Sequence, residues 1–293
     1  NYFTSLFNNI ICKFKKVHNG FPSSNITKII ILYIKLIVNN NIVIIFNYIT
    51  SLSFYLMLIF LYNSSMKILV TSGGTSEKID RVRSITNHSS GKLGKIITET
   101  LLKAGHEVCL ITTLQAVKPV NHPNLTIIEI KNTADLLQVM KDKVTDYQVL
   151  IHSMAVSDYT PVYMAGFDEV EASQDLTEFL DKKNQETKIS SKEDVQVLFL
   201  KKNPKIISLV KEWNPNIHLI GFKLLVDVSQ EHLIQIARES LEKNQADLIV
   251  ANDLTQISSE QHKAYLVEKN SFQTAMSKHE IADLLLEKIK SYD

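Results

Sequence analysis

Met66-Lys-Ile-Leu-Val-Thr-Ser-Gly-Gly74 is the part of the sequence on which the predicted architecture depends. Residues 68–72 form a short run of strand-forming side chains, and the two glycines that follow end it. Residues 92–104 then place apolar side chains at helical spacing, and Gly105 ends that segment. A strand, a glycine turn and an amphipathic helix in this order are typical of a β-α-β unit.

The same alternation continues to the end of the chain. It predicts strands at residues 107–113, 125–130, 148–152, 195–200, 217–225, 247–251 and 264–268, and helices at residues 133–144, 203–213, 229–244 and 277–289. Residues 158–188 have few apolar side chains and weak periodicity, so we expect an excursion or flap at about 158–194. The fold class is therefore α/β, a Rossmann-like, mostly parallel sheet with helices on both faces, plus this flap.

Residues 1–65 differ in composition from the rest of the chain. They contain five lysines and no acidic residue, and residues 42–62 are uncharged and long enough to span a bilayer. We favour the interpretation that this leader is not part of the functional domain, which we place at residues 66–293 and expect to be soluble and active by itself. A membrane anchor is the alternative, and a signal peptide fits less well because no small-residue cleavage site follows.

Charge and cysteine content exclude several classes of protein. Residues 66–293 carry 27 basic and 31 acidic residues, and this balance argues against a nonspecific nucleic-acid binder. The only cysteines, Cys12 and Cys109, are too few for a disulfide framework. A reducing, cytoplasmic location fits best.

The most specific chemical signal is the donor-rich loop at residues 81–94. It contains Arg81, Arg83, Asn87 and His88 and continues as Ser89-Ser-Gly-Lys-Leu-Gly94 into the start of a predicted helix. The free N–H groups of a helix start carry about half a positive charge, so the arrangement suits phosphate groups. Capping by Ser89 or Ser90 is the structural alternative, but capping alone does not require the other donors.

Further candidates follow other predicted strands, each with a structural alternative. The Gly73-Gly74 turn is a weak phosphate-binding candidate or a plain turn. Asp158 is a candidate for a metal or a substrate hydroxyl, or forms a turn. Phe222 stacks on a base or packs in the core, and Asn252 reads a base edge or ribose or forms a turn. Lys188 in the flap holds a triphosphate or is simply solvated.

The sequence offers no strong metal-binding spacing and no signature of a covalent nucleophile. No general base stands out either. These observations point to phosphoryl or nucleotidyl transfer driven by positioning and charge stabilisation.

The motifs, taken in order, resemble those of phosphopantothenate–cysteine ligase in its stand-alone bacterial form. The resemblance rests on Ser72-Gly-Gly-Thr75, Ser84-Ile-Thr-Asn-His-Ser-Ser-Gly-Lys-Leu-Gly94, Ala155-Val-Ser-Asp-Tyr159, Lys188-Ile-Ser-Ser191, Lys202-Asn-Pro204, Gly221-Phe-Lys223 and Ala251-Asn-Asp253. It covers residues 66–293 and not residues 1–65. The Asn-His-Ser-Ser-Gly run is its most specific part.

The resemblance implies a two-step ligation in coenzyme A biosynthesis. The carboxylate of 4′-phosphopantothenate attacks the α-phosphorus of CTP and releases pyrophosphate, and the amine of L-cysteine then displaces CMP from the acyl-cytidylate. ATP is the alternative nucleotide. Mg²⁺ is implied as an ion carried by the nucleotide, with no metal site built by the protein. A homodimer is implied because the arginine loop of this family can cross to the partner subunit.

The resemblance also implies site residues. Asn87 is the implied catalytic residue and holds the acyl-nucleotide intermediate. The implied nucleotide-binding residues are Gly73, Gly74, Ser89, Gly91, Gly94, Asp158, Lys188, Lys202, Asn203, Pro204, Phe222 and Asn252. The implied phosphopantothenate-binding residues are Arg83, Ala155 and Asp158.

Some positions depart from the family pattern. The bifunctional bacterial relatives carry two lysines where this chain has Ser240 and Asn244. Lys223 or Lys243 is a candidate to supply the missing charge, and Met154 stands where many relatives have alanine. An NADP- or nucleotide-binding Rossmann module without ligase activity remains the alternative function, and a membrane-tethered binding module is a third.

Overall fold

The structure is a computed structural model that describes residues 65–182, 193–258 and 261–292. The chain divides into two units, and the described residues belong to the second, Ser64–Asp293. The expectations for residues 1–64 and for Lys188 lie outside the described residues. Within the described ranges, no helix combines the length and the apolar character that a membrane crossing requires.

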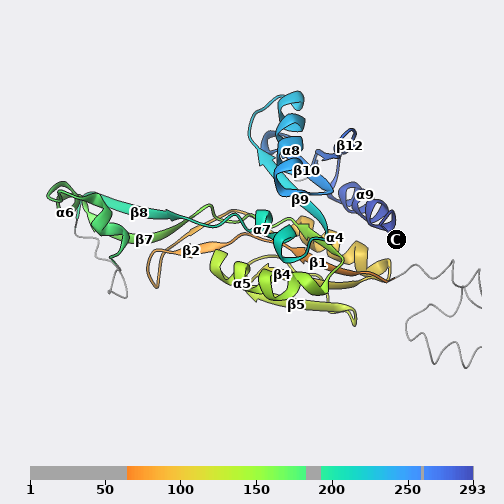
Figure 1. The fold of residues 1–293 in the computed structure, drawn as a ribbon, viewed down its shortest axis with the longest axis horizontal. Coiled ribbons are helices and arrows are strands. Elements are labelled where there is room, and N and C mark those ends of the chain that lie inside the picture. The colour runs from red at the N-terminus through yellow and green to blue at the C-terminus, as the bar shows by residue number, and fades with distance from the viewer. Residues whose placement is uncertain (1–64, 183–192, 259–260, 293) are drawn as a thin grey trace, which may run out of the picture. The chain divides into compact units, whose positions relative to one another are not determined.

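An eight-stranded sheet forms the centre of this unit (Figure 1). The parallel strands are β1 (Lys67–Thr71), β4 (Glu107–Thr113), β5 (Leu125–Ile130), β6 (Val149–His152), β9 (His218–Leu225) and β10 (Leu248–Asp253). The antiparallel strands β11 (Ala264–Val267) and β12 (Phe272–Ala275) complete one edge, in the order β12-β11-β10-β9-β6-β1-β4-β5.

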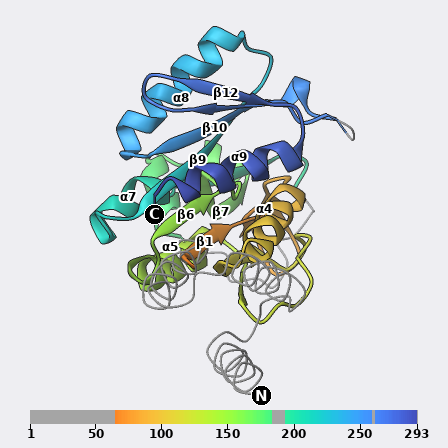
Figure 2. The same cartoon turned by 90° about the vertical axis from the view of Figure 1, so that its right-hand side faces the viewer.

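Helices cover both faces of this sheet. One face carries α4 (Lys92–Lys103) and α9 (Lys278–Lys290), which lie near each other in Figure 2. The opposite face carries α5 (Thr133–Lys143), α7 (Ile206–Trp213) and α8 (Gln230–Asn244). The predicted mostly parallel, Rossmann-like α/β fold is therefore confirmed.

The central strands are buried on both sides, as their continuous apolar sequences require. In β1, Leu69 joins the hydrophobic cluster under α5, α7 and α8, whereas Ile68 and Val70 join the cluster under α4 and α9. All three side chains are fully buried. Cys109 in β4 is buried as a free thiol and packs in the core as a small apolar residue.

Three of the described α-helices start with a side-chain cap. The side chains of Asn132, Ser229 and Ser277 accept N–H groups at the starts of α5, α8 and α9. Helix α4 is different, because its N-cap is Gly91, which has a φ of 74° and no side chain. The Ser90 Oγ accepts the N–H of Lys92 over a long 3.4 Å, so the first turn of α4 is only weakly capped.

A two-stranded antiparallel ribbon begins in the predicted excursion, and sequence periodicity revealed only its second strand. Strand β7 (Tyr159–Gly166) pairs with β8 (Gln196–Lys202), and α6 (Phe167–Glu171) follows β7. Phe179 is fully buried between the rings of Tyr163 and Phe199, so the ribbon has an aromatic core of its own. The strand expected at residues 195–200 thus exists, but outside the central sheet.

One further prediction needs correction, and three short strands were not predicted. The helix expected from Asn203 starts at Ile206, so Pro204 precedes the helix instead of opening it. The strands β2 (Ser76–Lys78) and β3 (Ser84–Thr86) form a small hairpin that was not predicted. Strand β12 was also missed, because only its last residue is buried and short exposed strands carry no apolar pattern. Short 3₁₀ turns occupy Val144–Asp146, Leu176–Leu180 and Leu254–Gln256.

Candidate active site

A cleft of about 640 Å³ lies at the carboxyl ends of β1, β6 and β9. From β1 the chain proceeds to β4 and β5 on one side, and it then returns to β6 on the other side of β1. This reversal is the topological switch point at which α/β sheets bind ligands. The cleft is lined by residues 88–94 at the start of α4, 152–158 after β6, 204–207 around the start of α7 and 222–224 in β9.

The start of α4 gives the cleft its main anion-binding feature. Ser89, Gly91 and Gly94 all line the cleft, as do the residues between them. Gly94 lets the helix approach the end of β1, because a Cβ at this position would overlap the side chain of buried Ser72. The weakly capped N–H groups of this helix therefore face a cavity that admits a ligand.

The Gly73-Gly74 turn contacts two loops, the one that contains Asn87 and the one that contains Ala155. Gly73 has a φ of 88°, and its carbonyl accepts the N–H of Ala155 at 2.9 Å. A Cβ on Gly74 would overlap the main-chain oxygen of Asn87. Neither glycine is among the residues that line the cleft, so their expected role in phosphate binding stays a prediction.

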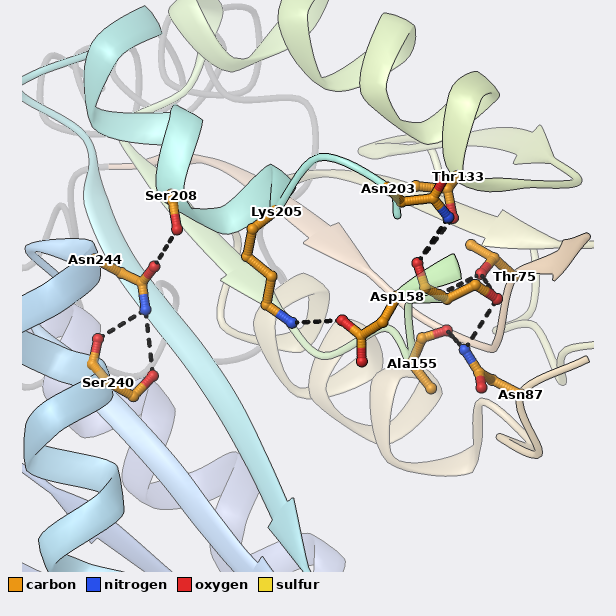
Figure 3. Close-up of polar contacts among 11 residues, drawn as sticks. Thr75, Asn87, Thr133, Ala155, Asp158, Asn203, Lys205, Ser208, Ser240 and Asn244 are labelled. Carbon is orange, nitrogen blue, oxygen red and sulfur yellow. Dashed lines mark hydrogen bonds and ion pairs between the residues drawn. The ribbon is translucent and has the colours of Figure 1, made fainter. Parts of the chain in front are cut away.

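Asn87 lies beside the cleft. Its Nδ2 donates to the Ala155 carbonyl at 3.4 Å and to the Ser157 Oγ at 3.3 Å, two long bonds to residues that line the cleft (Figure 3). The Oδ1 of Asn87 accepts no hydrogen bond from any described residue. The carboxamide is thus held next to the strand end with an acceptor available for a ligand.

Arg83 lies in the turn of the β2–β3 hairpin and does not line the cleft. Its guanidinium donates to Asp80 Oδ2 at 2.7 and 3.0 Å. Within one chain this arginine is therefore occupied by a local ion pair. Contact with phosphopantothenate across a subunit boundary stays a prediction.

Near the start of β7 and the end of β8, some of the predicted site residues line the cleft and others do not. Asp158 lines the cleft and pairs with Lys205 at 3.1 Å, and Pro204 lines it as well. Asn203 instead donates to the Ser157 carbonyl at 2.9 Å (Figure 3). It also accepts from the Thr160 hydroxyl, so it ties the two ends of the ribbon together.

Lys202, in contrast, is exposed on β8 and lies outside the cleft.

Ser240 and Asn244, the two positions at which the resemblance implies lysines, form a neutral polar wall. Asn244 accepts from the Ser208 hydroxyl at 2.8 Å and donates to the main-chain oxygen of Ser240 at 2.7 Å. Ser240 and Asn244 both line the cleft, and Lys223 does too, whereas Lys243 does not. Of the two candidates for the missing charge, Lys223 is thus the one in position.

On the far side of the cleft, Phe222 and Asn252 occupy neighbouring strands. Phe222 is half-buried and packs against the core while lining the cleft. The Asn252 Nδ2 donates to the Lys263 carbonyl at 2.9 Å, so part of its hydrogen-bonding capacity is used by the fold.

His152 is a site residue that the sequence reasoning missed. It ends β6, lines the cleft and shares a 2.8 Å hydrogen bond between its Nδ1 and the Thr71 hydroxyl. Burial, with a smaller effect from Lys205, lowers the pKa of His152 to about 4, so the ring is neutral at pH 7. Its position as the last residue of a predicted buried strand was the available signal.

No group of three or more His, Cys, Asp or Glu side chains among the described residues is arranged to hold a metal ion. The charged groups that line the cleft are mainly cationic. They comprise Lys92, Lys205, Lys223 and Lys278, with Asp158 as the single carboxylate among the lining residues that the structure describes. Such a cleft favours a ligand with several negative charges.

Asp253 holds the loop that closes this end of the sheet. It is 2% exposed, and its carboxylate accepts the N–H groups of Asp227, Val228 and Thr255 at 2.8–3.1 Å. These hydrogen bonds, of which the one from Val228 has the largest effect, lower the pKa of the Asp253 carboxyl to about 2.

We expect Asp253→Asn to lower the melting temperature at pH 7, because the carboxylate is replaced by a group that also carries an N–H donor. A carboxyl with a depressed pKa contributes stability above its ordinary pKa, and this contribution is lost as the pH falls toward 2. The difference between wild type and variant should therefore shrink between pH 4 and pH 2 in thermal melts. Asp142→Asn, at an exposed carboxylate bonded to Gln138, is the control and should melt like wild type.

The comparison with known families decides the classification. A family model described as the C-terminal domain of DNA/pantothenate metabolism flavoprotein matches residues 64–167 and 172–292. The chain belongs to this family. The resemblance noted from the motifs is thereby confirmed at the level of the family, and the match begins at residue 64.

Relatives of this DNA/pantothenate metabolism flavoprotein domain include coenzyme A biosynthesis proteins. The bifunctional protein CoaBC of Thermococcus kodakarensis is 34% identical over 228 residues, which cover 76% of this chain and 51% of that protein. The chain spans about half the length of the curated relatives that it matches first.

Two solved structures of this family resemble the chain closely enough to be informative. The DNA/pantothenate metabolism flavoprotein from Streptococcus pneumoniae is 73% identical, with a TM-score of 0.76 over 78% of this chain and 100% of that chain. The C-terminal domain of CoaBC is 26% identical, with a TM-score of 0.57 over 78% of this chain and 95% of that chain.

Proposed function

We propose that this protein ligates 4′-phosphopantothenate and L-cysteine to 4′-phosphopantothenoyl-cysteine in coenzyme A biosynthesis, with CTP as the activating nucleotide. Membership of a family whose relatives are coenzyme A biosynthesis proteins supports the pathway. The single observation that carries the chemistry is the cation-lined cleft at the switch point, with the weakly capped start of α4 on one side and Asn87 beside it.

The proposed reaction has two steps. A carboxylate oxygen of phosphopantothenate attacks the α-phosphorus of CTP, the bond to the β-phosphate breaks, and pyrophosphate leaves. The amine of cysteine then attacks the acyl carbon of the acyl-cytidylate, loses a proton and displaces CMP. Both steps need negative charge to be stabilised more than they need a protein nucleophile, which fits the donors and cations of this cleft.

We assign the residues to the substrates as follows. Ser89, Gly91 and Gly94 would bind phosphate, and Phe222 and Asn252 would contact the base and ribose, a proposal supported by the position of all five in the lining of the cleft. Asp158 and Ala155 border the region next to Asn87 where the acyl group would lie. Mg²⁺ would enter with the nucleotide. We further propose a cytoplasmic homodimer in which the Arg83 loop reaches the partner's cleft.

The test is pyrophosphate release by the purified protein, with phosphopantothenate, cysteine, Mg²⁺ and either CTP or ATP. We expect release only when nucleotide and phosphopantothenate are both present, with CTP used better than ATP, and product only when cysteine is added. Tight binding of NADPH without any pyrophosphate release would instead support a binding module without ligase activity.

A further inference from the structure

Two lysines converge at one end of the cleft. Lys92 is the first residue of α4 and Lys278 is the first residue of α9, and both line the cleft. Helices α4 and α9 pack against each other on the same face of the sheet (Figure 2). The fold therefore brings two positively charged side chains together at the starts of two adjacent helices.

Nothing in the described part of the chain neutralises this pair. Neither lysine lies within 4.0 Å of a described carboxylate, although eight lysine–carboxylate pairs occur elsewhere in the described residues. Partial burial and the charge of Lys92 both lower the pKa of Lys278. Lys278 is half-buried and Lys92 is exposed. Like charges held near each other raise the free energy of the protein until an anion binds there.

His262 adds a donor to the same place. It precedes β11, lines the cleft, and its Nδ1 is buried without a hydrogen-bond partner among the described residues. Burial and the nearby charge of Lys278 lower the pKa of His262 to about 4, so the ring is neutral at pH 7 and offers one N–H. The ring thus stands next to Lys278 with a polar nitrogen that lacks a partner.

A phosphoryl group matches these donors better than a carboxylate does. It carries up to two charges and three terminal oxygens, enough for two ammonium groups and one imidazole. The cleft also presents the weakly capped N–H groups of α4, whose first residue is Lys92.

We propose that Lys92, Lys278 and His262 form a phosphate subsite of the cleft that binds a terminal phosphoryl group of a substrate. The inference rests on the proposed function for its substrates, which offer two sources: the triphosphate of the nucleotide and the phosphate of phosphopantothenate. The subsite supplies positive charge from α4 and α9, whereas α8 presents the neutral side chains of Ser240 and Asn244 to the cleft.

Binding measurements on the full chain test the subsite without relying on turnover. The probes are tripolyphosphate, which represents the nucleotide tail, and 4′-phosphopantothenate, each titrated by calorimetry at low salt. We expect Lys278→Gln and Lys92→Gln each to lower the affinity for one of the two probes about tenfold or more, because each removes a charge-assisted contact. Lys278→Arg should retain most of the affinity. The probe whose affinity falls identifies which substrate supplies the phosphoryl group.

The matched controls are Lys103→Gln and Lys290→Gln, at the opposite ends of the same two helices. They change the net charge equally but lie outside the cleft, so they should bind both probes like wild type. Equal affinity of wild type and both cleft variants for both probes would overturn the subsite, as would an equal loss in the controls. A chain that binds a probe through these lysines yet makes no product would contradict the proposed ligase and leave the subsite intact.

Discussion

Asn87→Ala should lower the rate of amide formation by about 10²–10³-fold, the usual effect of removing one positioned donor or acceptor at a reacting centre. In the structure the carboxamide is anchored through its Nδ2 to Ala155 and Ser157, and its Oδ1 accepts no hydrogen bond from the described residues. An anchored group with an available acceptor is already oriented and loses little entropy when it binds the intermediate.

The measurement should separate the two steps of the proposed reaction. Pyrophosphate release in a single turnover reports activation of the carboxylate, and cysteine-dependent CMP release reports amide formation. We expect the first to remain close to wild type and the second to fall. Product formation by Asn87→Ala at the wild-type rate would remove Asn87 from the mechanism.

Thr86→Val is the matched control for this experiment. Thr86 is adjacent to Asn87, and its hydroxyl lies 2.7 Å from that of Ser76 on the exposed hairpin. Valine has nearly the same shape but lacks the hydroxyl, so this variant changes the hairpin without touching the cleft. Its rates for both steps should match those of wild type.

Gly94→Ala should destabilise the protein by about 1–3 kcal/mol, the usual cost of inserting a methyl group into a packed contact. At a solvent-exposed position within a helix, a change from glycine to alanine would stabilise the protein by up to about 1 kcal/mol. A steric clash therefore predicts a change in stability of the opposite sign. The new methyl group would overlap Ser72, whose short side chain is buried and cannot turn away. Helix α4 would have to move, and nucleotide affinity should fall together with stability in denaturant titrations.

A compensating change distinguishes this steric cause from a general effect. Ser72→Gly removes the atoms that the alanine would meet, so the double variant should recover part of the stability lost by Gly94→Ala. Gly105→Ala is a second control, because no atom lies within 4 Å of the position that its new methyl group would take, but its φ is 96°. It should be destabilised through backbone strain alone, with unchanged nucleotide affinity.

Much of the site could be predicted because its residues are local in sequence. Ser89, Gly91 and Gly94 precede or open one helix, and donors next to glycines at a helix start are by themselves typical of an anion site. Asp158 follows from the rule that strand ends of a parallel sheet share one edge, whereas Phe222 lines the cleft from within β9.

Other parts depend on contacts that spacing does not reveal. Lys278 reaches the cleft only because α9 packs beside α4, more than 180 residues away in the chain. Arg83 is engaged by Asp80 three residues earlier, a local pair that competes with any ligand. The roles of Gly73 and Gly74 likewise depend on which loops approach them.

The ribbon of β7 and β8 has a consequence for how the cleft behaves in time. Its rings pack around Phe179, so its opening free energy is set by its own small core. Segments of this kind unfold as separate cooperative units while the rest of a protein stays intact. Asp158 and Pro204, at the two ends of the ribbon, both line the cleft. Opening of the cluster around Phe179 would therefore loosen one wall of the cleft, and we expect a ligand in the cleft to slow amide hydrogen exchange along β7 and β8.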